Sequence, residues 1–250
     1  MFVAVCDCCG QDSELLLPEL LAGAGYTTML AGTDHSNTVH LVLCCGGKWH
    51  LGHRPQYLPL RHGFHRWLGA PNCHFQYGVK WRPGPNIPVY EDGEMVGRYY
   101  EGDFGIDIKS GRSNFTKRLT EAATQFMQVR RGWSMFSLVI SGPPLQRDDT
   151  SNPYFLYFAP DSTHAPAYSS ADWAGSSVRA THYGAAVREL DWAVGRVLSA
   201  AAGNSRNTLV IFTSDNGAAL ISREQAGSSG PLLCGKQTTF EVVFSCTFSH

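Results

Sequence analysis

The sequence has little charge, and neither sign is in excess. Only 16% of its 250 residues are charged, and the formal net charge is -1 at pH 7. Proteins that bind nucleic acid or anionic membranes need a basic surface, so this composition excludes both kinds of partner. With 43% hydrophobic residues, the chain can build a sizeable core, and one large domain is expected.

Long apolar runs and paired cysteine motifs are also missing. The longest apolar run, residues 39–45, is interrupted by His40 and is too short to span a bilayer. The apolar patch in the first ten residues has no basic residue before it, which is not typical of a signal peptide. The eight cysteines form no pair of C-x-x-C motifs, so buried or unpaired thiols are expected rather than a zinc site.

Helix and strand patterns in the remaining sequence are typical of an α/β protein. The predicted helices lie at residues 12–24, 116–131 and 179–202. The predicted strands lie at residues 28–31, 153–158 and 209–212, and the last two are expected to be buried. Residues 58–100 are rich in Pro, Gly and aromatic side chains, so we expect little regular structure there, either as a cleft wall or as a packed surface loop.

Polar side chains follow two of the predicted strands. Asp215 and Asn216 come directly after strand 209–212, and His164 follows strand 153–158. If these strands are parallel neighbours, the three side chains share one sheet edge, where the Asp–Asn pair offers oxygens to a cation. The alternatives are an Asx turn at Asp215 and a capping or core-packed role for His164.

A glycine-flanked loop brings together Lys48, His50, His53 and Arg54. Such a group of cationic and proton-donating side chains suits an anionic substrate such as a sulfate or phosphate ester. The alternative is a solvated basic loop that Trp49 anchors in the core.

Two further features lie outside that loop. A Gly/Ser-rich stretch, residues 227–235, precedes Lys236. Asn114 begins an N-x-T glycosylation sequon, which is meaningful if the chain enters the secretory pathway.

Four motifs occur in a fixed order along the chain: G-K-W-H-L-G, T-H-A-P, T-S-D-N-G and C-G-K-Q-T-T-F-E. In this order they resemble the sulfatase family of the alkaline-phosphatase-like superfamily, over roughly residues 12–241. The resemblance implies an α/β fold with a mostly parallel central sheet flanked by helices, here incomplete at both ends. It also implies hydrolysis of sulfate esters of glycosaminoglycans.

The resemblance assigns roles to the candidate site residues. It places Lys48 and Lys236 on the sulfate oxygens and His50 near the nucleophile, and it gives His164 a role in binding sulfate and assisting the leaving group. Cations placed in this way neutralise the charge that develops as the sulfur–oxygen bond breaks.

The same resemblance implies a cofactor and a cellular setting. Asp215 and Asn216 match calcium ligands, and Asn114 matches a glycosylated position. A sulfated glycosaminoglycan or small sulfate ester, a homodimer and a lysosomal location follow from the family, with no nucleic-acid or membrane partner.

The chain also departs from the family pattern. Sulfatases make their formylglycine nucleophile from a C-x-P-x-R motif, and no cysteine here precedes that pattern, so we find no nucleophile and expect these 250 residues to be inactive. We interpret the chain as a partial catalytic domain with insertions at 33–45 and 131–152 and a divergent tail at 242–250. Unspliced sequence or an alternative transcript would explain these segments, and sequencing the messenger RNA tests this. A non-catalytic truncated product and a phosphoester hydrolase of the same superfamily are the alternatives.

Overall fold

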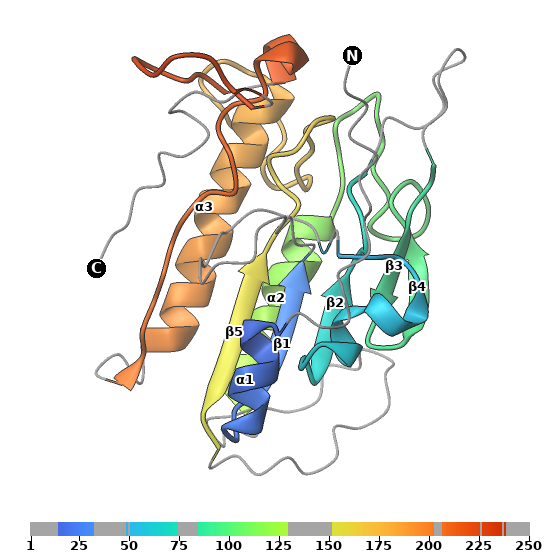
Figure 1. Ribbon diagram of the computed structural model, residues 1–250. Helices are drawn as coiled ribbons and strands as arrows, with labels where there is room; N and C mark the ends of the chain where they lie inside the picture. The colour runs from blue at the N-terminus through green and yellow to red at the C-terminus, as the bar shows by residue number, and fades with distance from the viewer. Residues whose placement is uncertain are drawn as a thin grey trace.

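The computed structural model describes residues 15–32, 49, 51–74, 85–129, 152–202, 207–225, 227–236 and 238. The predicted insertion at 33–45, the tail at 242–250 and all but the last residue of the insertion at 131–152 lie outside these residues. Figure 1 shows the described elements as a twisted sheet with helices on both of its faces.

The sheet has five strands in the order β4-β3-β2-β1-β5. They are β1 (Thr27–Gly32), β2 (Arg66–Gly69), β3 (Pro88–Glu91), β4 (Glu94–Arg98) and β5 (Tyr154–Ala159). The central strand β1 runs parallel to β2 and β5, with Leu30 opposite Trp67 on one side and Tyr157 on the other. Strands β1 and β5 confirm the strands predicted at 28–31 and 153–158, although β5 is an edge strand and only its Ala159 is fully buried.

Strands β2, β3 and β4 correct the expectation of an irregular segment at 58–100. Strand β3 pairs antiparallel with both β2 and β4, so the sheet is mixed rather than mostly parallel. The β3–β4 hairpin turns at Asp92, whose backbone has a φ of 52°. Its carboxylate accepts bonds from Arg66 Nε and from the Trp67 backbone N–H, each 2.9 Å long. Asp tolerates this left-handed conformation, and the two bonds of its side chain hold the turn against strand β2.

In the described part of the chain, three α-helices cover the sheet: α1 (Leu17–Gly23), α2 (Phe115–Val129) and α3 (His182–Ala201). Figure 1 shows α1 on one face of β1 and α2 on the other. Alternation along β1 explains the two layers, since Leu30 packs with Trp49 and Trp67, whereas Met29 and Ala31 pack with α2 and α3. The predictions at 116–131 and 179–202 are therefore confirmed. None of the helices in the described ranges is long and apolar enough to cross a membrane.

Two helix starts follow from local chemistry. Thr181 caps α3 because its hydroxyl accepts a bond from the Gly184 N–H at 3.0 Å. Helix α1 begins at Leu17, later than predicted, with Pro18 in its first turn, where a missing N–H costs nothing. Glu19 Oε2 accepts a bond from the Leu16 N–H at 2.7 Å, which fixes that start.

The prediction of a buried strand at residues 209–212 is wrong. This segment is not paired with the sheet, and the Leu209 and Phe212 side chains are 84% and 51% exposed. In Figure 1 it runs along the outside of α3. A run of β-branched and large apolar residues favours extended backbone, but a strand also needs a neighbouring edge, and this segment does not reach one.

The carboxyl ends of β1, β2 and β5 approach one another closely. A β-carbon on Gly32 would lie well under 3.0 Å from the carbonyl oxygen of Ala159, and one on Gly69 would crowd the Gly32 carbonyl oxygen equally. Gly32 also has a φ of 131°, which L-residues with side chains rarely adopt. Glycine at these two positions lets three parallel strands end at one compact edge.

Candidate functional site

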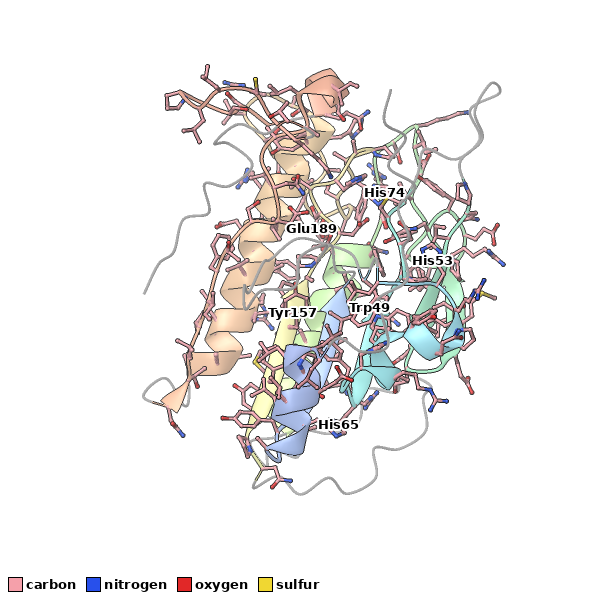
Figure 2. The ribbon with its side chains drawn as sticks, in the orientation of Figure 1. Trp49, His53, His65, His74, Tyr157 and Glu189 are labelled. Carbon is pink, nitrogen blue, oxygen red and sulfur yellow. The ribbon has the colours of Figure 1, made fainter. Side chains whose placement is uncertain are left out.

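The chain segments after β2 and β5 leave the sheet at this same edge. Residues 70–74 follow β2, and residues 160–168 follow β5. Figure 2 shows His74 at this end of the sheet and His65 at the opposite end. Ligands in parallel α/β sheets bind beyond the carboxyl ends of the strands, which makes this edge the candidate site.

A buried imidazole–carboxylate pair occupies the edge. His74 Nδ1 is paired with Asp161 Oδ2, and neither side chain is exposed to solvent. His74 Nε2 lies 3.1 Å from the carbonyl oxygen of Pro166 and donates to it. Tyr168 donates its hydroxyl to the same Asp161 oxygen at 3.5 Å. A buried carboxylate is tolerated only when such partners compensate its lost hydration.

Aromatic rings enclose this pair. The His74 ring centroid lies 5.3 Å from that of Tyr99 and 5.5 Å from that of Tyr168. Burial, reinforced by the negative charge of Asp161, raises the pKa of Tyr168 well above its ordinary value. The Tyr168 hydroxyl therefore keeps its proton and acts as a donor.

His164 lies in the loop after β5, as the sequence predicts. Its backbone N–H donates to the Asp161 carbonyl oxygen at 3.0 Å, which closes a turn. Its half-buried ring meets the His74 ring edge-on, with 5.1 Å between centroids and 79° between planes. The structure thus places His164 beside the buried pair, while its role in sulfate binding stays a prediction.

The basic loop is described only in part, because Lys48 and His50 lie outside the described residues. Trp49, between them, is 1% exposed and donates its indole N–H to the Tyr57 carbonyl oxygen at 2.5 Å. Its role as a core anchor is therefore confirmed. The loop also reaches the edge of the sheet, since the Asn72 amide donates to His53 Nε2 at 2.7 Å.

Asp215, Asn216 and Lys236 form a second, separate group. Ser214 Oγ donates to the Asn216 carbonyl oxygen at 2.9 Å, and the Lys236 N–H donates to the Ala218 carbonyl oxygen at 2.9 Å. These bonds bring the lysine segment beside the Asp–Asn segment. The expectation that Asp215 and His164 end neighbouring strands is wrong, because residues 209–212 form no strand.

A backbone-to-side-chain hydrogen bond links the two groups. Gln225, at the end of the 3-10 helix η4 (Leu220–Gln225), accepts a bond from the Ala167 N–H at 3.0 Å. Ala167 lies three residues beyond His164, so the segment between Asn216 and Lys236 touches the His164 loop. The convergence of the predicted site side chains on one site remains a prediction.

The described residues do not complete a calcium site. Asp215 and Asn216 supply the hard oxygen donors that calcium prefers, but calcium takes six to eight oxygens. Within the described ranges, no three His, Cys, Asp or Glu side chains are grouped closely enough to hold a metal ion.

A second buried carboxyl belongs to helix α3. Glu189 of α3 is fully buried, and its Oε2 accepts a bond from the Ser170 N–H at 2.9 Å. Burial raises the pKa of Glu189 above its ordinary value of 4.5, and the bond from Ser170 opposes this rise.

The raised pKa of Glu189 predicts a pH dependence. The unfolded chain loses this proton near pH 4.5, whereas the folded chain keeps it to higher pH. The contribution of Glu189 to the free energy of unfolding is therefore largest below pH 4.5 and is lost as the pH rises through the pKa of the folded state. The loss is about 1.4 kcal/mol for each unit by which folding raises this pKa. Glu189→Gln should remove this fall. Urea unfolding of both proteins from pH 4 to 8 measures it, and parallel curves would contradict the prediction.

Sequence reasoning missed His74, Asp161 and Asn72. His74 and Asn72 lie in the segment expected to be irregular, so the strand that positions them was not recognised. Asp161 precedes the predicted His164 by three residues, in the same loop, and no motif in the sequence marks it. The usable signal was the short apolar run Trp67-Leu68-Gly69 before P-N-C-H, which resembles the strand and polar loop before His164.

Comparison with known proteins places this arrangement in a family. The family model described as Sulfatase matches residues 9–241. N-acetylgalactosamine-6-sulfatases from Mus musculus and Homo sapiens are each 49% identical over 234 residues, and arylsulfatase A from Bos taurus is 34% identical over 236 residues. These matches cover 92%, 92% and 91% of this chain, but only 38%, 38% and 40% of the relatives.

A solved structure has the same fold. The PsFucS1 sulfatase from Pseudoalteromonas sp. superposes with a TM-score of 0.63 at 23% identity, over 90% of this chain and 42% of that one. At this identity the likeness supports the fold alone, and it agrees with the α/β sheet flanked by helices. Because the family model covers nearly all of these residues, we conclude that the chain belongs to the sulfatase family.

Proposed function

We propose that this chain is part of the catalytic domain of a sulfuric ester hydrolase that acts on N-acetylgalactosamine 6-sulfate groups of glycosaminoglycans. The observation behind the proposal is the 49% identity to N-acetylgalactosamine-6-sulfatase over 92% of the chain. The chain spans 38% of that relative, so activity and substrate are proposed here for the whole protein.

In this proposal four side chains recognise the sulfate. Lys48 and Lys236 bind its oxygens as cations, His50 acts beside the nucleophile, and His164 binds sulfate and protonates the departing sugar oxygen. Their charges and protons stabilise the negative charge that develops on the ester oxygen. The 2.9 Å bond between the Lys236 N–H and Ala218 fixes the backbone of one of them.

The nucleophile is absent from these 250 residues. No cysteine in them begins a C-x-P-x-R motif. We therefore propose that these residues by themselves bind sulfated sugar but do not turn it over at a useful rate, since removing a nucleophile costs several orders of magnitude in rate. Calcium, to which Asp215 and Asn216 would contribute oxygens, needs further ligands beyond the described residues.

Binding measurements test the proposal. We expect the chain to bind N-acetylgalactosamine 6-sulfate by calorimetry, and Lys236→Ala or Lys48→Ala to weaken binding about tenfold or more, because each removes a charge-assisted bond. Lys109→Ala, at an exposed lysine of another loop, is the charge-matched control and should have no effect. Measurements with and without calcium show whether the metal contributes.

Two outcomes would count against this function, and a third would contradict the proposed lack of turnover. Equal binding of the unsulfated sugar would remove the role of sulfate, and tighter binding or hydrolysis of the 6-phosphate would favour a phosphoester hydrolase. Calcium-dependent turnover of an aryl sulfate that Lys48→Ala abolishes would mean that another nucleophile serves.

The cellular setting belongs to the same proposal. Asn114 is exposed to solvent immediately before α2. A glycosylated lysosomal protein that forms homodimers is proposed on the basis of the family. Expression of the full-length protein in a secretory cell, followed by a mass shift on glycan removal that Asn114→Gln abolishes, checks the glycan.

A further inference from the structure

The loop after β5 is held at two points by one imidazole. His74 Nδ1 pairs with the carboxylate of Asp161 at the start of the loop, and His74 Nε2 donates to the Pro166 carbonyl oxygen, 3.1 Å away, near its end. His164 lies between these two points, with its ring centroid 5.1 Å from that of His74. A single side chain therefore bridges the ends of the segment that presents His164.

The bridging imidazole is itself fixed to the sheet. His74 follows β2, whereas the loop follows β5, and β1 pairs with both strands. Tyr99 and Tyr168 pack against the His74 ring from two sides, and the ring has no exposed surface. A buried ring between packed aromatics occupies one rotamer, so both of its bonds have a fixed direction.

We infer that His74 is a positioning residue, which sets the place of the His164 imidazole by clamping residues 161–166 at both ends. The inference rests on the proposed function for the statement that His164 faces sulfate. The clamp itself depends only on the two bonds of His74 and is measurable without a substrate.

Three variants separate the two bonds. His74→Phe keeps an aromatic ring but removes both bonds. In His74→Asn the amide lies near the former Nδ1 and can still bond Asp161, whereas in His74→Gln it lies near the former Nε2 and can still bond Pro166. His65→Asn is the matched control, because His65 bonds Thr28 at the opposite end of the sheet, as Figure 2 shows.

Amide hydrogen exchange measures how firmly His74 holds the loop. The His164 N–H bonds the Asp161 carbonyl oxygen, and the Ala167 N–H bonds Gln225, each at 3.0 Å. We expect His74→Phe to speed exchange at both amides about tenfold or more, with the amides of α2 unchanged, since lost buried hydrogen bonds favour local opening. In His74→Asn the His164 amide should stay better protected from exchange than the Ala167 amide. In His74→Gln the Ala167 amide should be the better protected of the two. If the Phe variant does not fold, the two amide variants decide.

The position of His164 gives a second readout. The ring proton resonances of His164, identified with His164→Asn, should shift in all three His74 variants and stay in place in His65→Asn. Affinity for N-acetylgalactosamine 6-sulfate should fall about tenfold in His74→Phe and less in the amide variants, by loss of preorganisation. A merely structural role would change stability without the pattern that separates Asn from Gln.

The outcomes distinguish this inference from the proposed function. If the loop amides of His74→Phe exchange at the wild-type rate and the His164 resonances do not shift, the clamp is wrong, even if the chain binds the sugar. An unchanged affinity despite a released loop would overturn the positioning role. Failure of the wild-type chain to bind the sulfated sugar would instead contradict the proposed function, and the exchange data would still decide the clamp.

Discussion

Asp161→Ala is expected to lower the free energy of unfolding by about 3–5 kcal/mol, the usual cost of removing one partner of a buried ion pair. The substitution leaves His74 Nδ1 without its partner in a place with no access to water. It also removes the acceptor of the Tyr168 hydroxyl, which burial and charge keep protonated. Urea or thermal unfolding followed by circular dichroism measures the change.

Asp161→Asn is the matched control for this prediction. Its amide can donate to the Nδ1 of a neutral His74, whose Nε2–H still donates to Pro166. We therefore expect a loss of only about 1–2 kcal/mol, the cost of exchanging a charged bond for a neutral one. Equal losses for the alanine and asparagine variants would mean that the lost bond to His74 is not the cause.

Gly32→Ala is expected to destabilise the chain by about 3–5 kcal/mol, because backbone strain and overpacking act together. The new β-carbon would overlap the Ala159 carbonyl oxygen, which belongs to the neighbouring strand and cannot rotate away. The φ of 131° adds strain that no change of rotamer relieves. Because β1 and β5 would have to separate at their carboxyl ends, the His164 loop should also move.

The control for Gly32 has the opposite expected sign. Gly23 lies in α1, and a β-carbon there would have no heavy atom within 4 Å outside its own neighbourhood. Gly23→Ala should therefore stabilise the chain by up to about 1 kcal/mol through helix propensity. Denaturant unfolding of the two variants side by side tests the pair. A loss in Gly32→Ala no larger than about 1 kcal/mol would show that the strands separate easily there.

The sequence predicted those helices and strands whose apolar pattern is typical of a single type of secondary structure. Apolar spacing over 182–201 defines a helix face, and Thr181 provides its cap. Strands β1 and β5 are short runs of mostly apolar residues whose side chains pack into the cores on the two faces of the sheet. In each case local preference and burial favour the same element, so the sequence alone was sufficient.

Residues 209–212 had the local preference of a strand and did not become one. Strand formation depends on an available neighbour, and a sequence pattern does not show which edges are free. The hairpin of β3 and β4 was missed for the converse reason. Its strands are four and five residues long, begin with Pro88 and include Gly97, so their composition resembles a loop.

The candidate site also contains residues that the sequence predicted and residues that only the structure revealed. His164 could be predicted because it follows a recognisable strand, and the motif around it resembles a family. His74 and Asp161 are 87 residues apart in the sequence and meet only because β2 and β5 both flank β1. Nothing in the local sequence of either residue reveals its partner, so this pair required the structure.

Gly69 has a consequence for inherited variation. Its hypothetical β-carbon would overlap the Gly32 carbonyl oxygen, which is backbone of the central strand. Every missense change of a glycine codon introduces a β-carbon, so no amino-acid replacement at this position avoids the overlap. Missense changes at this codon should therefore be removed by selection. Changes at the codons of Gly93 and Gly195 should be tolerated, because a β-carbon there would have no atom within 4 Å. A missense variant at Gly69 should therefore be interpreted as damaging to the fold.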